Sequence, residues 1–171
     1  MTIAEYRQRM RMMMDANTTT EYYLKDWHLQ KWLEQQNKET ATETCLYTVP
    51  PFLEYDLLNG FQRRFCNDGD YRFVYWGPPG SNTPRHSDVL HSFSWSFNVV
   101  GVKRWTFYGP PPTRHHQDDD DSAVDDESPL LVMEQPPQTL LVVPATWQHS
   151  VVNTKETLSI NHNWITASNI D

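Results

Sequence analysis

Strict alternation of apolar and polar residues in the second half of the chain predicts a series of short β-strands. The clearest cases are 92–100 and 157–164, in which every second side chain is small and polar. Shorter apolar or β-branched runs predict further strands at 71–76, 103–108, 140–143 and 151–152. Turns rich in glycine and proline separate several of these runs, and such a series is typical of a β-sandwich or jelly roll.

The polar faces of the two best-defined strands have two readings. Their residues are Ser94, Ser96, Asn98, Thr157, Ser159, Asn161 and Asn163. Strands of an ordinary sandwich turn their polar face to solvent. Because both strands flank segments that contain histidine, these residues could instead line a wet cavity that holds a ligand. The alternation alone leaves both readings open.

Helical and irregular segments precede the predicted strands. The expected elements are an amphipathic helix at 2–15, a strand at 21–28 and a short helix at 30–38. We expect a single domain over 1–171, with a flanking region at 1–70 and the β core at 71–165.

The composition predicts a folded protein that binds neither nucleic acid nor a membrane. Of the 171 residues, 38% are hydrophobic and 13% aromatic. A net charge of −8 argues against the basic surface that nucleic-acid binding requires. No run approaches the ~20 apolar residues of a membrane span, and 1–20 lacks the apolar block of a signal peptide. Two cysteines do not make a disulfide framework, so we expect the cytoplasm, with the nucleus as the alternative.

Two histidines and one aspartate are the candidate metal ligands. His86 and Asp88 are two residues apart, so in an extended chain both point to the same side. His149 lies 63 residues further along, after a buried strand. Two histidines and one carboxylate can hold non-haem Fe(II) with positions left open for reactants. Ordinary core or surface histidines are the alternative that the spacing does not exclude.

Lys103 is the candidate anion-binding residue. A lysine inside a cavity is costly unless it meets an anion, and a dicarboxylate would suit it. Thr83 and Tyr23 could add hydroxyl donors to the same anion. The alternative is that Lys103 and Arg104 form a solvent-exposed pair at a turn.

An acidic segment at 118–127 follows His115 and His116. The two histidines with the neighbouring aspartates could bind a divalent ion. Blocks of like charge usually repel one another and remain solvated, so we expect a solvated loop.

An ordered set of short segments resembles the JmjC-domain oxygenases. The segments are Gly77–Ser81, His86–Asp88, Ser94–Asn98, Lys103–Trp105, Val143–His149 and Ser159–Trp164, with Tyr23–His28 and Asp70–Tyr75 upstream. Together they are similar to the JmjC domain-containing protein 4 family, the lysyl hydroxylases of the eukaryotic translation termination factor. The resemblance covers nearly all of the chain and is weakest in 34–68 and 110–135.

The resemblance implies a double-stranded β-helix, a cupin-type jelly roll, that uses Fe(II), 2-oxoglutarate and O₂. The residues that match the family's iron ligands are His86, Asp88 and His149. The residues that match its contacts to the distal carboxylate of 2-oxoglutarate are Lys103, Thr83 and Tyr23. The residues expected at the carboxylate nearer the metal are Asn161, Ser96 and Asn98.

The implied partner is a protein substrate, the peptide chain release factor, hydroxylated on a lysyl side chain. Full-length relatives continue into C-terminal helices that help them to form homodimers, and we expect this chain to lack those helices. The alternatives are a JmjC demethylase of methyl-lysine and a non-catalytic cupin-like binding module. The family commonly has aromatic residues at the positions of Asn82 and Arg85, and Arg85 could therefore change the mouth of the cavity or the charge of the substrate that it accepts.

Overall fold

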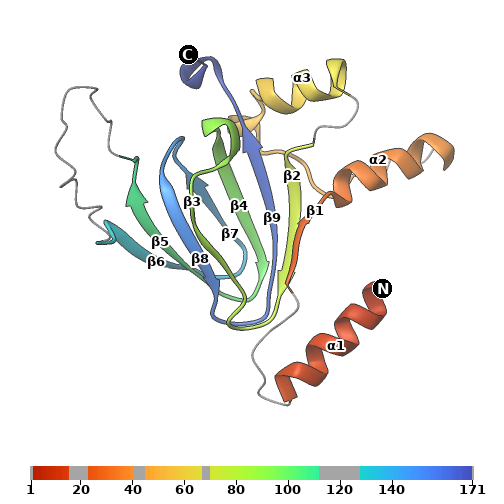
Figure 1. Cartoon of the computed structure of the whole chain (residues 1–171). Helices are drawn as coiled ribbons and strands as arrows, with labels where there is room; N and C mark the ends of the chain where they lie inside the picture. Colours follow the sequence, from red (N-terminus) through yellow and green to blue (C-terminus); the bar gives the residue numbers. More distant parts are fainter. Residues whose placement is uncertain (1, 16–22, 41–44, 67–69, 112–127, 171) are drawn as a thin grey trace, which may run out of the picture.

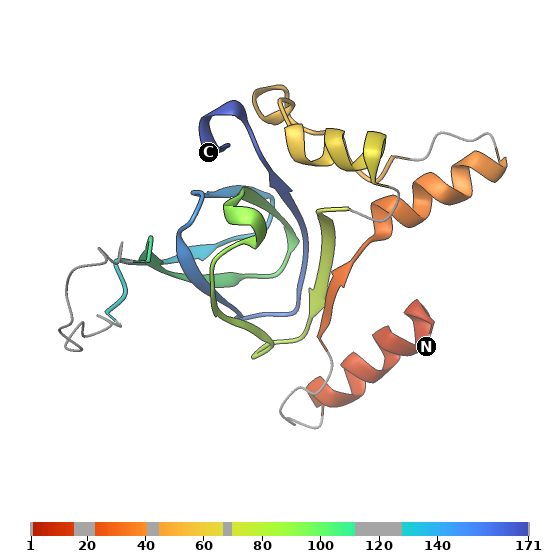
Figure 2. The same cartoon turned by 45° about the horizontal axis from the view of Figure 1, so that its top comes forward.

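Two antiparallel β-sheets face each other in the computed structural model of the chain (Figure 1). The structure describes residues 2–15, 23–40, 45–66, 70–111 and 128–170. The larger sheet has the strand order β1-β2-β9-β4-β7, and the smaller one has the order β3-β8-β5-β6. Figure 2 shows the sheets curving around a common interior. The prediction of a mainly β, cupin-like jelly roll is confirmed.

The elements follow one another in a simple order along the chain. The strands are β1 (Leu24–Trp27), β2 (Arg72–Gly77), β3 (Asn82–His86), β4 (Phe93–Val100), β5 (Lys103–Gly109), β6 (Leu131–Gln135), β7 (Thr139–Val143), β8 (Gln148–Asn153) and β9 (Thr157–Trp164). The α-helices are α1 (Ile3–Asp15), α2 (Leu29–Thr40) and α3 (Leu57–Phe65). The 3₁₀ turns are η1 (Pro51–Leu53), η2 (Val89–His91) and η3 (Ala167–Asn169). No helix in these described parts is long and apolar enough to cross a membrane.

The polar faces of β4 and β9 lie inside the roll. Ser96, Asn98 and Ser159 are at most 1% exposed. The reading of these faces as solvated is therefore wrong, and the reading that they line a ligand-holding cavity stays a prediction. The opposite face of the same sheet carries an apolar cluster around Leu53, Trp95 and Trp164, which Tyr47, Val49 and other partly buried side chains extend.

A second apolar cluster fills part of the interior. It consists of Trp105, Phe107, Leu141, Val143 and Val151, with Trp147 packed against it. Its members come from β5, β7 and β8, which belong to both sheets. The interior is thus apolar in one part and polar in another.

The N-terminal helix packs on the roll through its predicted apolar side. Met10 is 1% exposed, and Tyr6 is also buried. The Tyr6 hydroxyl donates to the carbonyl of Trp76 and accepts from the amide of Leu24 at 3.0 Å. Figure 1 shows α1, α2 and α3 on the side of the larger sheet that faces away from the smaller one. The predicted helices at 2–15 and 30–38 are observed with slightly shifted ends.

Among the α-helices and strands, α3, β3 and β6 had no prediction. The helix α3 begins after Asp56, whose carboxylate accepts from the amides of Leu58 and Asn59, as in a common N-cap. The strands β3 and β6 are edge strands, and β3 contains Pro84, which only an edge strand tolerates well. The acidic segment 118–127 and the pair His115-His116 lie outside the described residues.

Candidate metal centre

The three predicted metal ligands converge at one end of the smaller sheet. His86 is the last residue of β3, Asp88 directly precedes η2, and His149 is the second residue of β8. One ligand atom from each of the three lies within 4.8 Å of the other two. The imidazole centroids of His86 and His149 are 4.3 Å apart, because the two residues are paired across β3 and β8.

Hydrogen bonds orient each of these side chains. Nδ1 of His86 is 2.9 Å from the carbonyl oxygen of Pro84, and Nδ1 of His149 is 3.2 Å from that of Trp147. A carbonyl oxygen can only accept, so both Nδ1 atoms carry the proton and both Nε2 atoms keep a free lone pair. The Oδ2 atom of Asp88 accepts from the Ser94 hydroxyl at 2.6 Å, which leaves Oδ1 for another partner.

This donor set fits a divalent first-row transition metal. Two imidazole nitrogens and one carboxylate oxygen are available, and the far side of each ligand is already held by the protein. His149 is 3% exposed, and the rings of Trp105 and Phe107 lie beside it at 5.5 and 5.9 Å. Burial lowers the pKa of His149, and the neutral imidazole is the form that binds metals.

Lys103 lies inside the roll, as its predicted role requires. It is 2% exposed, and its Nζ atom donates to the Ser159 hydroxyl at 2.6 Å. In the described part of the chain, no carboxylate lies within salt-bridge distance of this amine. Burial alone lowers the pKa of Lys103 to about 7. The solvent-exposed alternative applies only to Arg104, which lies on the outer side near Glu134.

The small polar residues form a hydrogen-bonded row beside Lys103. The hydroxyls of Ser96 and Ser159 both donate to Oδ1 of Asn161, at 3.1 and 3.3 Å. Asn98 shares their face, but its amide donates to the backbone carbonyls of Gly101 and Gln135. Ser96 and Asn161 can therefore turn toward a ligand more easily than Asn98 can.

Tyr23 and Thr83 meet on the same side of the interior as Tyr75, whose ring lies 6.1 Å from that of Tyr23. The Tyr23 hydroxyl makes hydrogen bonds with the side chains of Asn153 and Thr83, and burial raises its pKa to about 12. Gly77 makes room for the ring, since a Cβ atom at this position would lie 2.5 Å from Tyr23. The contacts thus place the predicted residues in three groups, the metal-donor set, the row beside Lys103 and the Tyr23–Thr83 pair, and their action as one site stays a prediction.

Two residues of this interior were missed from the sequence. Tyr75 on β2 is paired with Ser159, and its ring lies 5.6 Å below the Lys103 amine. Its hydroxyl donates to Asp26 at 2.6 Å. Asn153 is four residues after His149 on the same strand, an even spacing that places both on one face and could have been noticed.

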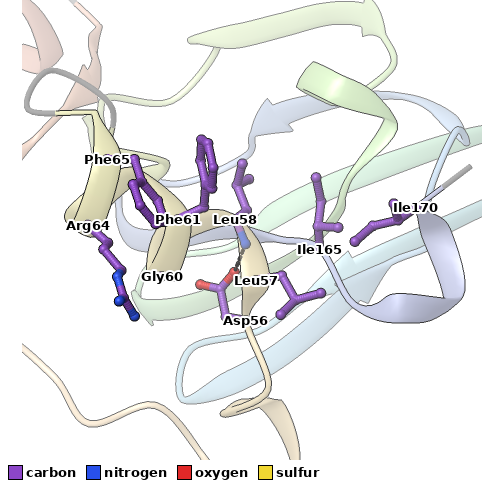
Figure 3. Close-up of a pocket in the computed structure, with 9 residues that line it drawn as sticks. All are labelled: Asp56, Leu57, Leu58, Gly60, Phe61, Arg64, Phe65, Ile165 and Ile170. Atoms are coloured by element: carbon purple, nitrogen blue, oxygen red, sulfur yellow. Dashed lines mark hydrogen bonds between the residues drawn. The ribbon is translucent and has the colours of Figure 1, made fainter.

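A separate hollow of about 520 Å³ lies between α3 and the C-terminal residues (Figure 3). Its wall includes the apolar side chains of Leu57, Phe61, Phe65 and Ile165. None of the predicted site residues lines it. Asp56 contributes a carboxylate whose oxygens are occupied by backbone amides and by His162.

The chain is similar to proteins of known class over most of its length. No family model matches it. It is 36% identical over 165 residues to the 2-oxoglutarate and iron-dependent oxygenase JMJD4 of Gallus gallus, covering 86% of this chain and 37% of that protein. It is 37% identical over 177 residues to the arginine-specific demethylase JMJ20 of Arabidopsis thaliana, with the same coverage of 86% and 37%.

A solved structure supports the fold at a lower level of similarity. The ribosomal oxygenase YcfD of Escherichia coli superposes with a TM-score of 0.50 at 13% identity, over 87% of this chain and 33% of that one. The chain spans 37% of the length of the curated relatives named above. The ordered sequence motifs, the jelly roll and the identity to JMJD4 agree, and the chain belongs to the JMJD4 family of JmjC-domain proteins.

Proposed function

We propose that this chain forms the core of a 2-oxoglutarate- and Fe(II)-dependent oxygenase that hydroxylates a protein side chain. The observation that carries the proposal is the juxtaposition of two features in one interior. Three metal-donor atoms lie within 4.8 Å of one another, and a buried lysine lacks an acidic partner among the described residues. The first feature suits a metal, and the second suits the carboxylate of a co-substrate.

The metal would be held by Nε2 of His86, Nε2 of His149 and Oδ1 of Asp88. The chain keeps these atoms available through hydrogen bonds on the opposite side of each ligand, from the carbonyls of Pro84 and Trp147 and the hydroxyl of Ser94. Such outer contacts fix the tautomer and the ring orientation before a metal binds.

The co-substrate would lie between the metal and Lys103. The Lys103 amine would pair with its distal carboxylate, and the hydroxyls of Thr83 and Tyr23 would add donors to the same group. Ser96 and Asn161 would meet the carboxylate nearer the metal, with Asn98 behind them. Fe(II), 2-oxoglutarate and O₂ together supply the oxidation that converts a substrate C–H bond to C–OH, with release of succinate and CO₂.

The residues of the chain then have three tasks. The donor set orients the metal, the polar row orients the co-substrate, and the aromatic side chains keep water away from the reacting atoms. Trp105 and Phe107 supply this shield beside His149. Water exclusion strengthens the charge-assisted contact of Lys103, because a low dielectric increases electrostatic attraction.

The proposed substrate is a lysyl side chain of the translation termination factor, which a cytoplasmic location would suit. The family resemblance and the identity to JMJD4 support this assignment. A second candidate activity is protein demethylation, which the 37% identity to an arginine-specific demethylase favours. Both activities begin with the same oxidation, and they differ in whether the oxygen stays on the substrate or leaves as formaldehyde.

Two measurements test the proposal. Anaerobic addition of Fe(II) and 2-oxoglutarate should produce a weak visible charge-transfer band, and release-factor peptides should stimulate succinate formation in air. Mass spectrometry should then find one added oxygen atom on a lysine, whereas formaldehyde release would indicate the demethylase. A chain that gives neither the band nor succinate would be the non-catalytic module. Lys155→Met, at an exposed lysine, is the control for general effects of charge.

A further inference from the structure

Two polar side chains stand directly before the two histidine ligands. Arg85 precedes His86 on β3, and Gln148 precedes His149 on the neighbouring strand β8. Nε and Nη2 of Arg85 donate to the same oxygen of Gln148, at 2.8 and 2.5 Å. The guanidinium also lies 4.3 Å from the ring centroid of Tyr108 on β5.

These contacts lie on the outer face of the smaller sheet. Side chains alternate along a strand, so Gln148 points away from the side on which His149 lies. Tyr108 likewise follows Phe107, which belongs to the interior cluster. Arg85 therefore contacts the back of the sheet, and the expectation that it changes the mouth of the cavity is wrong.

The main-chain pairing of β3 is interrupted next to the metal centre. Thr83 is paired with Val151, and the next pair is His86 with His149. Three steps along β3 thus correspond to two steps along β8, which is a β-bulge. Pro84 lies inside this bulge and has no N–H group to donate. In addition, β3 is an edge strand, so no strand of the sheet supports it from its other side.

We propose that Arg85 is a positioning residue for the metal centre. Its contacts with Gln148 and Tyr108 take the place of the interrupted ladder and hold the end of β3 against β8. They thereby keep the Nε2 atoms of His86 and His149 at the separation that one metal ion requires. The inference rests on the proposed function, since it assumes that these histidines bind a metal.

Charge and positioning predict opposite changes in metal affinity when Arg85 is removed. Arg85 carries a positive charge next to a ligand of a divalent cation, so charge alone predicts that its removal tightens metal binding. Loss of positioning predicts the opposite. Removal of a residue that orients a metal ligand typically weakens metal binding about 10–100-fold. Because Arg85 is exposed, we expect about tenfold, at the lower end.

The experiment is a titration of the apo protein with Co(II) under anaerobic conditions, without co-substrate. Arg85→Ala and Gln148→Ala should each weaken Co(II) binding about tenfold and alter the visible spectrum of the bound ion. The double variant should bind Co(II) no more weakly than either single variant does, because both changes break the same contact. Gln148→Glu keeps the acceptor and should bind Co(II) as well as the wild type does.

Arg104→Ala is the matched control. Arg104 is an exposed arginine on β5, on the same outer face of the smaller sheet as Arg85 and beside Glu134. Its loss should leave Co(II) affinity unchanged. If Arg85→Ala does not fold, Arg85→Lys keeps the charge, loses the planar contact and should still weaken binding. Unchanged or tighter Co(II) binding by the Arg85 variants would overturn the positioning role and leave the metal centre standing. A wild type that binds no Co(II) would overturn the metal centre, and the positioning role with it.

Discussion

Replacing Lys103 with methionine should stabilise the chain and abolish its use of 2-oxoglutarate. The lysine is buried, and burial lowers its pKa from 10.5 to about 7. At pH 7.5 the lysine is therefore protonated in the unfolded chain and mostly neutral in the folded one. Folding must remove this proton at a pH about three units below the pKa of the unfolded lysine. This costs about 4 kcal/mol, at ~1.36 kcal/mol per pH unit. Methionine has a similar volume and carries no charge, so it avoids the cost with little repacking.

The net gain is smaller because Ser159 loses its hydrogen-bond donor. That loss is worth about 1 kcal/mol, which leaves a net stabilisation of about 3 kcal/mol at pH 7.5. For a chain of this size, ~1 kcal/mol shifts the melting temperature by about 2–4 °C, so the expected rise is about 6–12 °C. The unfolded lysine binds a proton between about pH 7 and 10.5 and the folded one does not, so wild-type stability rises with pH in that window.

The assay is thermal unfolding at two pH values, with and without Mn(II) and 2-oxoglutarate. The advantage of Lys103→Met should disappear near pH 9.5, where the remaining deprotonation cost is only about 1 kcal/mol. In the presence of Mn(II), addition of 2-oxoglutarate should raise the melting temperature of the wild type but not of the variant. Lys155→Met should match the wild type throughout. A variant that is no more stable than the wild type at pH 7.5, or whose gain persists at pH 9.5, refutes the reasoning.

Three further predictions concern the metal, acid stability and a close contact. Asp88→Asn should abolish Co(II) binding in a titration and leave the melting temperature of the apo protein nearly unchanged. Burial raises the pKa of Asp56, but hydrogen bonds, chiefly with His162, outweigh it and lower the pKa overall, so this contribution to stability is lost as pH falls below about 4. Asp56→Asn should therefore flatten the acid limb of stability measured by urea unfolding. Gly77→Ala should destabilise the fold by about 1–3 kcal/mol and raise the 2-oxoglutarate requirement, because it displaces Tyr23.

Local spacing brings together two of the three candidate metal ligands, and strand pairing adds the third. His86 and Asp88 share a side because they are two residues apart, which is visible in any extended segment. His149 joins them only because β8 is the neighbour of β3, and no local pattern encodes which strands become neighbours. The sequence offered His149 as the third candidate only because it follows a buried strand, and the family resemblance added support to that choice.

The register of the sheets also explains which residues were missed. Tyr75 has nothing in its own sequence neighbourhood to separate it from other aromatic residues. Its role beside Lys103 follows from its pairing with Ser159, which lies 84 residues away. Arg85 was placed at the mouth because it lies beside His86 in the sequence. Neighbouring residues of a strand point to opposite faces, and Arg85 contacts Gln148 and Tyr108 instead.

The larger sheet has its polar face inside the roll and its apolar face outside, so the stability of the roll depends on the segment that precedes the strands and covers the outer face. The inner face of β4 and β9 is polar, so this sheet must bury its apolar side chains on its outer face. There Trp95 and Trp164 pack with Leu53, and burial of such side chains contributes about 1.5–3 kcal/mol each. The interior contains Lys103, whose burial opposes folding. The segment around Leu53 is thus a requirement for the roll, since it supplies the apolar cover that the polar interior does not provide.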